Sequence, residues 1–267
     1  MKILLVLYGI GRGPRRSHRS IYNNLIEPIR FLGEDLKIIY IFKNVSKNVL
    51  GDNIESETSN HLAAEADIFK SLTEEELLDV NLYNLSKTYK DKHRDNFVSN
   101  RNLICQLRKI QLSTSICDYS EYDRVILCRD DLEFWDGDLD WPLLFSITNH
   151  MPVTTTYFWN NGMSERFIVG KPDLIRHFAN RVEFAPRSIE HSGCLNGEYL
   201  QLFVSKKLKL KIAAKPIRFA RIRSEDGVVK ERLNLAFWRP QETVNVLFAY
   251  LRYLKCKTKI LIGITGR

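Results

Sequence analysis

The sequence predicts an α/β fold built around a mostly parallel sheet. The chain opens with an apolar run at residues 2–9, a glycine-rich turn, a helical pattern at residues 20–31 and a second apolar run at residues 36–42. Strand, turn, helix and strand in this order form the basic unit of a parallel sheet. A further β-forming run at residues 124–128 ends in adjacent carboxylates, and ligand sites of α/β proteins lie at the carboxyl ends of such strands. We therefore expect a mixed, mostly parallel, Rossmann-like sheet flanked by helices.

The other elements are predicted from the spacing of apolar residues. The clearest helix spans residues 97–117, with Leu103, Leu107, Ile110 and Cys117 along one stripe. A helix is also expected at residues 60–79, between a polar loop at 44–58 and an irregular charged stretch at 81–96. Later elements are a helix at 141–147, a strand at 153–159, a short apolar segment at 166–169, helices at 172–180 and 197–204, and strands at 208–213 and 217–222.

The composition suits one large domain followed by a different C-terminal segment. The 267 residues are 44% hydrophobic, which is enough to form a sizeable core. We expect a catalytic domain at residues 1–235 and a basic amphipathic helical tail at residues 236–267. The tail has an apolar helical face and several positive charges: Val244, Leu247, Phe248, Leu251 and Leu254 on the face, with Arg252, Lys255, Lys257 and Lys259. Such a helix either packs on its own domain or lies on an anionic membrane surface.

The charge of the chain indicates an anionic partner. Forty Lys and Arg residues against 32 Asp and Glu give a net charge of +8, which favours a nucleotide, a nucleic acid or a lipid headgroup. The basic residues are dispersed and match no nucleic-acid-binding motif, so we expect no nucleic-acid partner. Five cysteines without paired spacing are expected to be reduced thiols in a cytoplasmic compartment, with peripheral membrane contact through the tail left open.

Candidate ligand-binding residues follow the first and the third predicted strands. The turn after the first strand contains Gly9, Gly11, Arg12 and Arg15, and glycines beside a helix start, together with arginines, suit a phosphate. At the end of the third, the adjacent carboxylates of Asp130 and Asp131 repel each other, so a cation or a basic partner is expected to share their charge. The alternatives are a flexible turn and a solvated acidic loop.

Two later turns supply further candidates. Glu165 and Arg166 follow an Asn-Gly turn signal, and either they orient sugar hydroxyls or the segment is a plain connection. Glu198 follows a turn at the start of a helix, where it is a candidate general base or a helix cap. Arg221 and Arg223 lie at an expected strand end and could neutralise a diphosphate.

The order of these motifs resembles one family. A first strand with a Gly/Arg loop precedes Asn102-Leu103-x-x-Gln106-Leu107, then Tyr122-Asp123-x-x-Ile126-x-x-Arg129-x-Asp131-Leu132, then Arg166-Phe167-x-Val169-Gly170, and finally Gly197-Glu198 and Arg221-x-Arg223. This order resembles small GT-A-type glycosyltransferases of surface-polysaccharide pathways, over roughly residues 1–230. The resemblance implies that Asp131 belongs to a DxD-like motif holding Mn²⁺ or Mg²⁺ against the donor diphosphate. Here, however, the triplet is Arg129-Asp130-Asp131.

The resemblance implies a hexosyl- or pentosyltransferase that uses a nucleotide-diphosphate sugar and a glycan or lipid-linked acceptor. Asp130 and Asp131 are then the expected metal ligands, and Glu198 and Glu165 the expected catalytic acids. The donor would contact Arg129, Arg166, Arg223 and the first loop. Paired acids at a strand end would equally serve a nucleotidyltransferase or a phosphohydrolase, and a non-catalytic module binding a glycan or a membrane is the third alternative.

Overall fold

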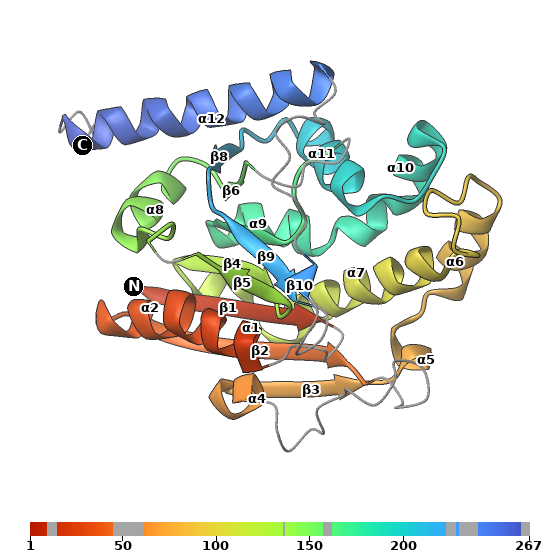
Figure 1. The fold of residues 1–267 in the computed structure, drawn as a ribbon, viewed down its shortest axis with the longest axis horizontal. Coiled ribbons are helices and arrows are strands. Elements are labelled where there is room, and N and C mark those ends of the chain that lie inside the picture. Colours follow the sequence, from red (N-terminus) through yellow and green to blue (C-terminus); the bar gives the residue numbers. More distant parts are fainter. Residues whose placement is uncertain are drawn as a thin grey trace.

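The fold, seen in a computed structural model, is described here for residues 1–9, 15–44, 61–135, 137–156, 162–222, 228–229 and 240–262. These residues form a seven-stranded sheet, with strand order β3-β2-β1-β4-β7-β6-β8, and a small sheet, with order β10-β9-β5 (Figure 1). Helices cover both faces of the large sheet. The predicted α/β class is thereby confirmed. No helix within these ranges combines the length and the apolar character that crossing a membrane requires.

The large sheet is parallel except at one strand. Its bounds are β1 (Lys2–Gly9), β2 (Asp35–Lys43), β3 (Ile68–Leu72), β4 (Arg124–Arg129), β6 (Val153–Thr155), β7 (Phe167–Gly170) and β8 (Ala213–Lys215). The strands β3, β2, β1 and β4 pair in parallel, whereas β7 runs antiparallel to both β4 and β6. Because β7 is reversed, the residues before it lie at the same edge as the residues after β4.

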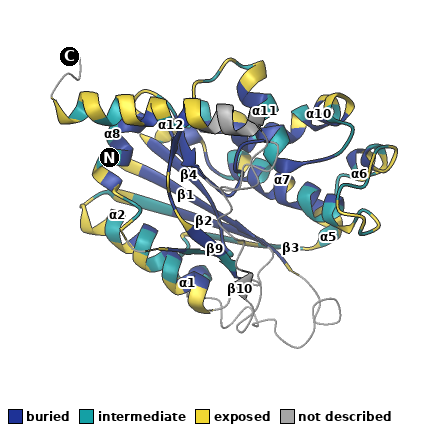
Figure 2. Cartoon of the chain, turned by 45° about the horizontal axis from the view of Figure 1, so that its top comes forward, coloured by how far each residue is buried: buried dark blue, intermediate teal, exposed yellow. Residues whose placement is uncertain are grey.

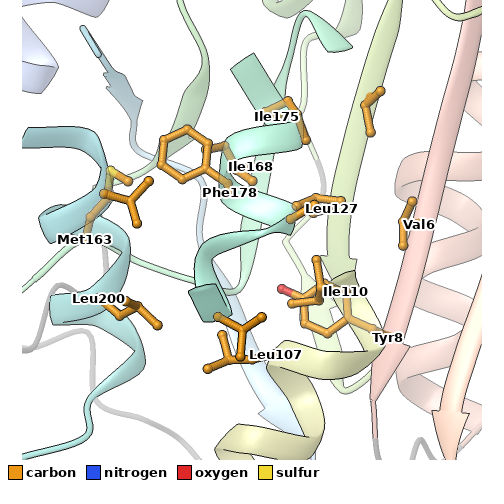
Figure 3. Close-up of a cluster of buried hydrophobic side chains, with 14 of the residues drawn as sticks. Val6, Tyr8, Leu107, Ile110, Leu127, Met163, Ile168, Ile175, Phe178 and Leu200 are labelled. Atoms are coloured by element: carbon orange, nitrogen blue, oxygen red, sulfur yellow. The ribbon is translucent and has the colours of Figure 1, made fainter. Parts of the chain in front are cut away.

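Alternating side chains of the strands divide the core into two clusters. Leu4, Val6 and Tyr8 of β1 face one cluster, and Ile3 and Leu5 face the other, as the two-residue period of a strand requires. The first cluster, drawn in Figure 3, lies beneath α6 (Val80–Lys87), α7 (Val98–Ile116), α9 (Pro172–Ala179), α10 (Ala185–Ser192) and α11 (Gly197–Lys207). The second lies beneath α1 (Arg15–Ile21), the π-helical turn η1 (Tyr22–Ile26), α2 (Glu27–Phe31), α4 (His61–Glu65) and α8 (Trp141–Thr148).

The prediction of a helix at residues 60–79 is wrong over most of its length. The segment contains α4, the strand β3 and α5 (Glu74–Leu77). The Phe69 ring stacks on Phe42 at a centroid distance of 5.2 Å, and β3 adds to the edge of β2. Apolar residues in this segment fit a helical period, but pairing with the sheet buries the aromatic rings better than a helix would.

Three smaller expectations also need correction. Residues 80–87, expected to be irregular, form α6, whose first turn is capped by Asp79 accepting from the Leu82 N–H at 3.0 Å. The strand expected at 208–213 lies instead at β8. The acidic turn contains β5 (Leu132–Phe134), which pairs with β9 (Phe219–Ile222), and β10 (Val228–Val229) completes the small sheet.

The C-terminal segment forms α12 (Pro240–Leu261), which lies against β8 and α8 (Figure 1). Of its side chains that the structure describes, from Leu247 onward, Ala249 and Tyr253 are buried, 2% and 4% exposed. The helical tail predicted from the sequence is thus observed, and it contacts its own domain. The domain boundary at residue 235 stays a prediction.

Core packing beneath α9 gives a direct test of the fold. Phe178 is fully buried in the first cluster, so Phe178→Ala is expected to lower the free energy of unfolding by about 3–5 kcal/mol. Urea unfolding followed by circular dichroism measures this loss. Phe31→Ala is the matched control, because Phe31 is 91% exposed and its truncation should change stability by less than about 0.5 kcal/mol. Equal losses in the two variants would contradict the described packing.

Candidate active site

A polar cleft of about 470 Å³ opens at the carboxyl end of β4. Five segments line it: the loop from Lys92 to Asp95, the first half of α7, the end of β4 with Asp130 and Asp131, the loop before β7, and the start of α11. Arg221 and Ile222 of β9 complete the wall. The cleft therefore lies where the sequence predicts a ligand site, at a strand end rich in carboxylates.

Asp130 is buried beneath the cleft in the space left by Gly9. Its Oδ2 accepts a hydrogen bond from the Tyr40 hydroxyl at 2.9 Å, and its backbone N–H donates to the Tyr8 carbonyl at 3.0 Å. A Cβ on Gly9 would lie 1.6 Å from Asp130 Oδ1, so only glycine fits there. Burial and the neighbouring Asp131 raise the pKa of Asp130. Asp130 is therefore an anchor that joins β4 to β1 and β2.

Lys109 of α7 lies on the other side of the same strand end. It is 1% exposed, and its ammonium donates to the Gly9 carbonyl. Burial lowers the pKa of Lys109 to about 8, while the Asp130 carboxylate acts in the opposite direction. The sequence analysis missed this lysine because nothing in its position on a regular helix distinguishes it from a solvated one.

Asp131 is held by Arg129 in a two-point ion pair. Arg129 Nε donates to Asp131 Oδ1 at 2.9 Å, and its Nη2 donates to Oδ2 at 2.6 Å. Burial acts to raise the pKa of Asp131, but Arg129, followed by Arg221 and Arg166, lowers it below the usual range. Asp131 therefore stays ionised among three guanidinium groups.

Glu165 lies between two buried arginines. Its carboxylate is 3.9 Å from Arg129 Nη1 and 3.7 Å from Arg181 Nη2. A Cβ on Gly197 would lie 2.1 Å from Glu165 Oε2, so the absence of a side chain at this position admits the carboxylate. Arg181 is 1% exposed and was missed, since it follows a predicted helix without any motif. This network fixes Glu165 in the wall, where it positions Arg129.

Glu198, like Asp130, is a carboxylate of the cleft whose pKa is raised. It lies in the first turn of α11, which Asn196 caps by accepting from the Tyr199 N–H at 3.0 Å. Burial raises the pKa of Glu198, and the carboxylate of Glu165 raises it further. The Met163 N–H donates to the Glu198 carbonyl at 2.8 Å, which ties the loop before β7 to α11. A half-buried carboxyl of raised pKa suits proton transfer near neutral pH.

The outer wall of the cleft contains strained backbone. Arg94, Asn96 and Phe97 have φ angles of 55°, 56° and 62°, values that side chains other than glycine rarely adopt. Asp91 stabilises this loop, because its carboxylate accepts from the N–H groups of His93, Arg94 and Phe97 at 3.0–3.1 Å. Asparagine adopts this conformation more readily than most residues, but Arg94 and Phe97 do not, so the local residue pattern does not predict this loop.

The expected metal site does not fit the residues as they are arranged. Both oxygens of Asp131 accept from Arg129, and the carboxylate of Asp130 points into the space beside Gly9. Among the described residues, no three His, Cys, Asp or Glu side chains form a group that could hold a metal ion. A cation at Asp131 would have to share this carboxylate with the guanidinium group of Arg129. The role of Asp130 and Asp131 as metal ligands stays a prediction.

The cleft gathers most of the predicted residues. Arg129, Asp130, Asp131, Glu165, Arg166 and Glu198 all line it, and Gly9 lies directly beneath. Arg15 is exposed at the start of α1 and is not among the lining residues. Gly11, Arg12 and Arg223 fall outside the described residues.

Comparisons with known proteins concern the fold alone. No family model matches the sequence, and no curated protein matches it significantly. One similar solved structure is mouse xyloside xylosyltransferase 1, at 12% identity and a TM-score of 0.41, covering 77% of this chain and 82% of the other. Another is a candidate nucleotide-diphospho-sugar transferase from Desulfovibrio desulfuricans G20, at 9% identity and a TM-score of 0.38, covering 79% and 78%. Both names agree with the expected GT-A-type resemblance, but scores this low transfer no activity to this chain.

The contact between Gly9 and Asp130 can be tested by substitution. Gly9→Ala forces a methyl group into the space of the carboxylate, and overpacking of this kind lowers stability by about 1–3 kcal/mol. Urea unfolding should also show that Gly9→Ala combined with Asp130→Ala loses less than the sum of the two single variants, since the double variant removes the clash. Strict additivity would show that the two residues do not share this space.

Proposed function

We propose that this protein is a glycosyltransferase that moves a sugar from a nucleotide-diphosphate donor to a hydroxyl group of a glycan or lipid-linked acceptor. One observation supports this above the others: Arg129, Arg166 and Arg221 line one cleft together with Glu198, whose pKa is raised. Guanidinium groups suit an anionic diphosphate, and a carboxylate of raised pKa suits an acceptor hydroxyl. The cleft has both at the carboxyl ends of parallel strands.

In the proposed mechanism the arginines stabilise the leaving group. As the bond between the anomeric carbon and the β-phosphate oxygen breaks, the electron pair goes to the nucleoside diphosphate. Arg166 and Arg221 would bind its phosphate oxygens, because planar guanidinium groups recognise phosphate through two parallel hydrogen bonds. Arg129 is already paired with Asp131 and contributes its charge from that position. Fixed charges of this kind need no reorganisation when the leaving group departs.

Glu198 is the proposed general base. The acceptor oxygen forms the new bond to the anomeric carbon while its proton passes to the Glu198 carboxylate, as an inverting reaction requires. Glu165 is less suited to this step, because it is 7% exposed and lies between Arg129 and Arg181. We assign it a positioning role. A retaining reaction would not need this base, so the stereochemistry of the product decides between the two.

Donor binding can be measured directly. Isothermal titration with UDP, GDP, CDP and dTDP, each with Mn²⁺ or with EDTA, is expected to show binding of one nucleotide in both conditions, because arginines line the cleft and Arg129 already pairs with Asp131. Arg221→Ala should weaken that binding about 10- to 100-fold, the effect of losing a charged hydrogen bond.

Arg176→Ala is the matched control. Arg176 forms an ion pair with Asp118, and Asp118 precedes β4, so this pair lies at the end of β4 opposite the cleft. Binding that occurs only in the presence of Mn²⁺ would support the prediction that Asp130 and Asp131 are metal ligands. No binding of any of the four nucleotides would contradict the proposed function and favour a non-catalytic module, and release of inorganic phosphate would favour a phosphohydrolase.

The role of Glu198 predicts a characteristic pH profile. A base must be ionised, so activity should fall as the pH drops through the raised pKa of Glu198, above the pH at which an ordinary glutamate would protonate. Glu198→Gln should lower kcat about 10²- to 10⁴-fold and abolish this acid limb. Rates measured across the pH range with the donor identified above provide the test. The exposed Glu190 offers a control, because Glu190→Gln should leave the profile unchanged. An unaltered acid limb in Glu198→Gln would exclude this base.

A further inference from the structure

The helix α12 contacts the domain through one narrow face. Ala249 and Tyr253 are buried, and Cys256 and Ile260 pack partly against the second core cluster. Arg252 adds a hydrogen bond from Nη1 to the Ile212 carbonyl at 3.2 Å. These residues recur at three- and four-residue intervals and so form a single stripe. The stripe is sufficient to hold the helix against β8 and α8.

The opposite face of α12 is apolar and exposed. Five large apolar residues of this face and one directly after the helix have exposed fractions of 36% to 71%: Leu247, Phe248, Leu251, Leu254 and Leu261, followed by Ile262. These are half of the twelve exposed large hydrophobic residues found anywhere in the described chain. Figure 2 shows the exposed positions along the outer side of this helix. A concentration of this kind on a single element marks an interaction surface.

The contacts of α12 bear on the alternative that the sequence left open. The apolar face recognised in the sequence was expected to pack on the domain or to lie on a membrane. Packing uses a different stripe, that of Ala249 and Tyr253, whereas the described members of the recognised face, from Leu247 to Leu254, remain in contact with solvent. Docking of α12 on its own domain therefore leaves the apolar face available to a partner.

The charges around this face identify the kind of partner. Lys255 and Lys259 are exposed, Lys257 is half-buried, and no acidic residue occurs between residues 247 and 262. An apolar stripe flanked by cations matches an anionic lipid surface, where the side chains enter the headgroup boundary and the cations contact lipid phosphates. A second copy of the chain is less favourable, because joining two such faces would bring their positive charges together.

We propose that the outer face of α12 binds an anionic lipid surface, with the helix lying in the plane of the interface. The proposal goes beyond the proposed transferase function and does not depend on it. It requires no membrane-spanning segment, since an interfacial helix inserts only its apolar side chains. The domain would then be attached through the contact of α12 with β8 and α8.

Co-sedimentation of the full chain with lipid vesicles tests the proposal. We expect the protein to sediment with vesicles of phosphatidylcholine mixed with phosphatidylglycerol, to sediment much less with phosphatidylcholine alone, and to be released by salt. Phe248→Asp combined with Leu251→Asp should abolish sedimentation. Lys255→Glu combined with Lys259→Glu should weaken it by about tenfold or more, because each cation near an anionic surface contributes about 1 kcal/mol.

Phe31→Asp is the matched control, because Phe31 is exposed on α2 and should not affect vesicle binding. Circular dichroism and the thermal midpoint establish that each variant is folded, and retained nucleotide binding separates this test from that of the catalytic cleft. Sedimentation of the Phe248→Asp/Leu251→Asp variant at the level of the unsubstituted chain would overturn the proposal. Absence of sedimentation with both kinds of vesicle would also overturn it. So would light scattering that shows a dimer of the unsubstituted chain and a monomer of this variant, because the partner would then be a second copy of the chain.

Discussion

A single buried carboxylate organises the edge of the sheet on which the cleft depends. Asp130 fills the space that Gly9 leaves, accepts from Tyr40 on β2, and faces the ammonium of Lys109 on α7. Three strands and one helix thus meet around one side chain. An unpaired buried charge would be strongly destabilising, so this arrangement persists only with all its partners in place. The orientation of the next residue, Asp131, follows from this anchoring.

The charges above this anchor are arranged so that two carboxyl groups differ in their protonation behaviour. Asp131, among three arginines, has a lowered pKa, whereas Glu198, beside Glu165, has a raised one. Environments that shift the pKa values of two carboxyl groups apart are typical of sites in which one acid remains a fixed charge and the other exchanges protons. The arginines therefore have two functions, since they hold Asp131 ionised and also line the cleft.

Much of the site could be predicted because its residues follow recognisable strand and turn signals. The paired aspartates after β4 and the early βαβ unit are legible from apolar runs and glycines. The position of Arg166 beside Asp131 depends on the reversal of β7, which no local pattern specifies. Lys109 and Arg181 become special only through burial by distant segments. The strand β3 escaped prediction, and the contacts of the apolar face of α12 were left open, because helical periodicity shows that residues share a face but not what that face contacts.

The strained loop between Asp91 and Phe97 has a consequence for the motion of the molecule. Backbone in the left-handed region costs about 1–3 kcal/mol for most residues other than glycine, and Arg94 and Phe97 adopt it here beside Asn96, which does so more readily. Local opening of this loop would release that free energy, which opening of the regular strands and helices around the cleft would not. Opening of this loop is therefore less costly than opening of the sheet that holds the Asp130 anchor.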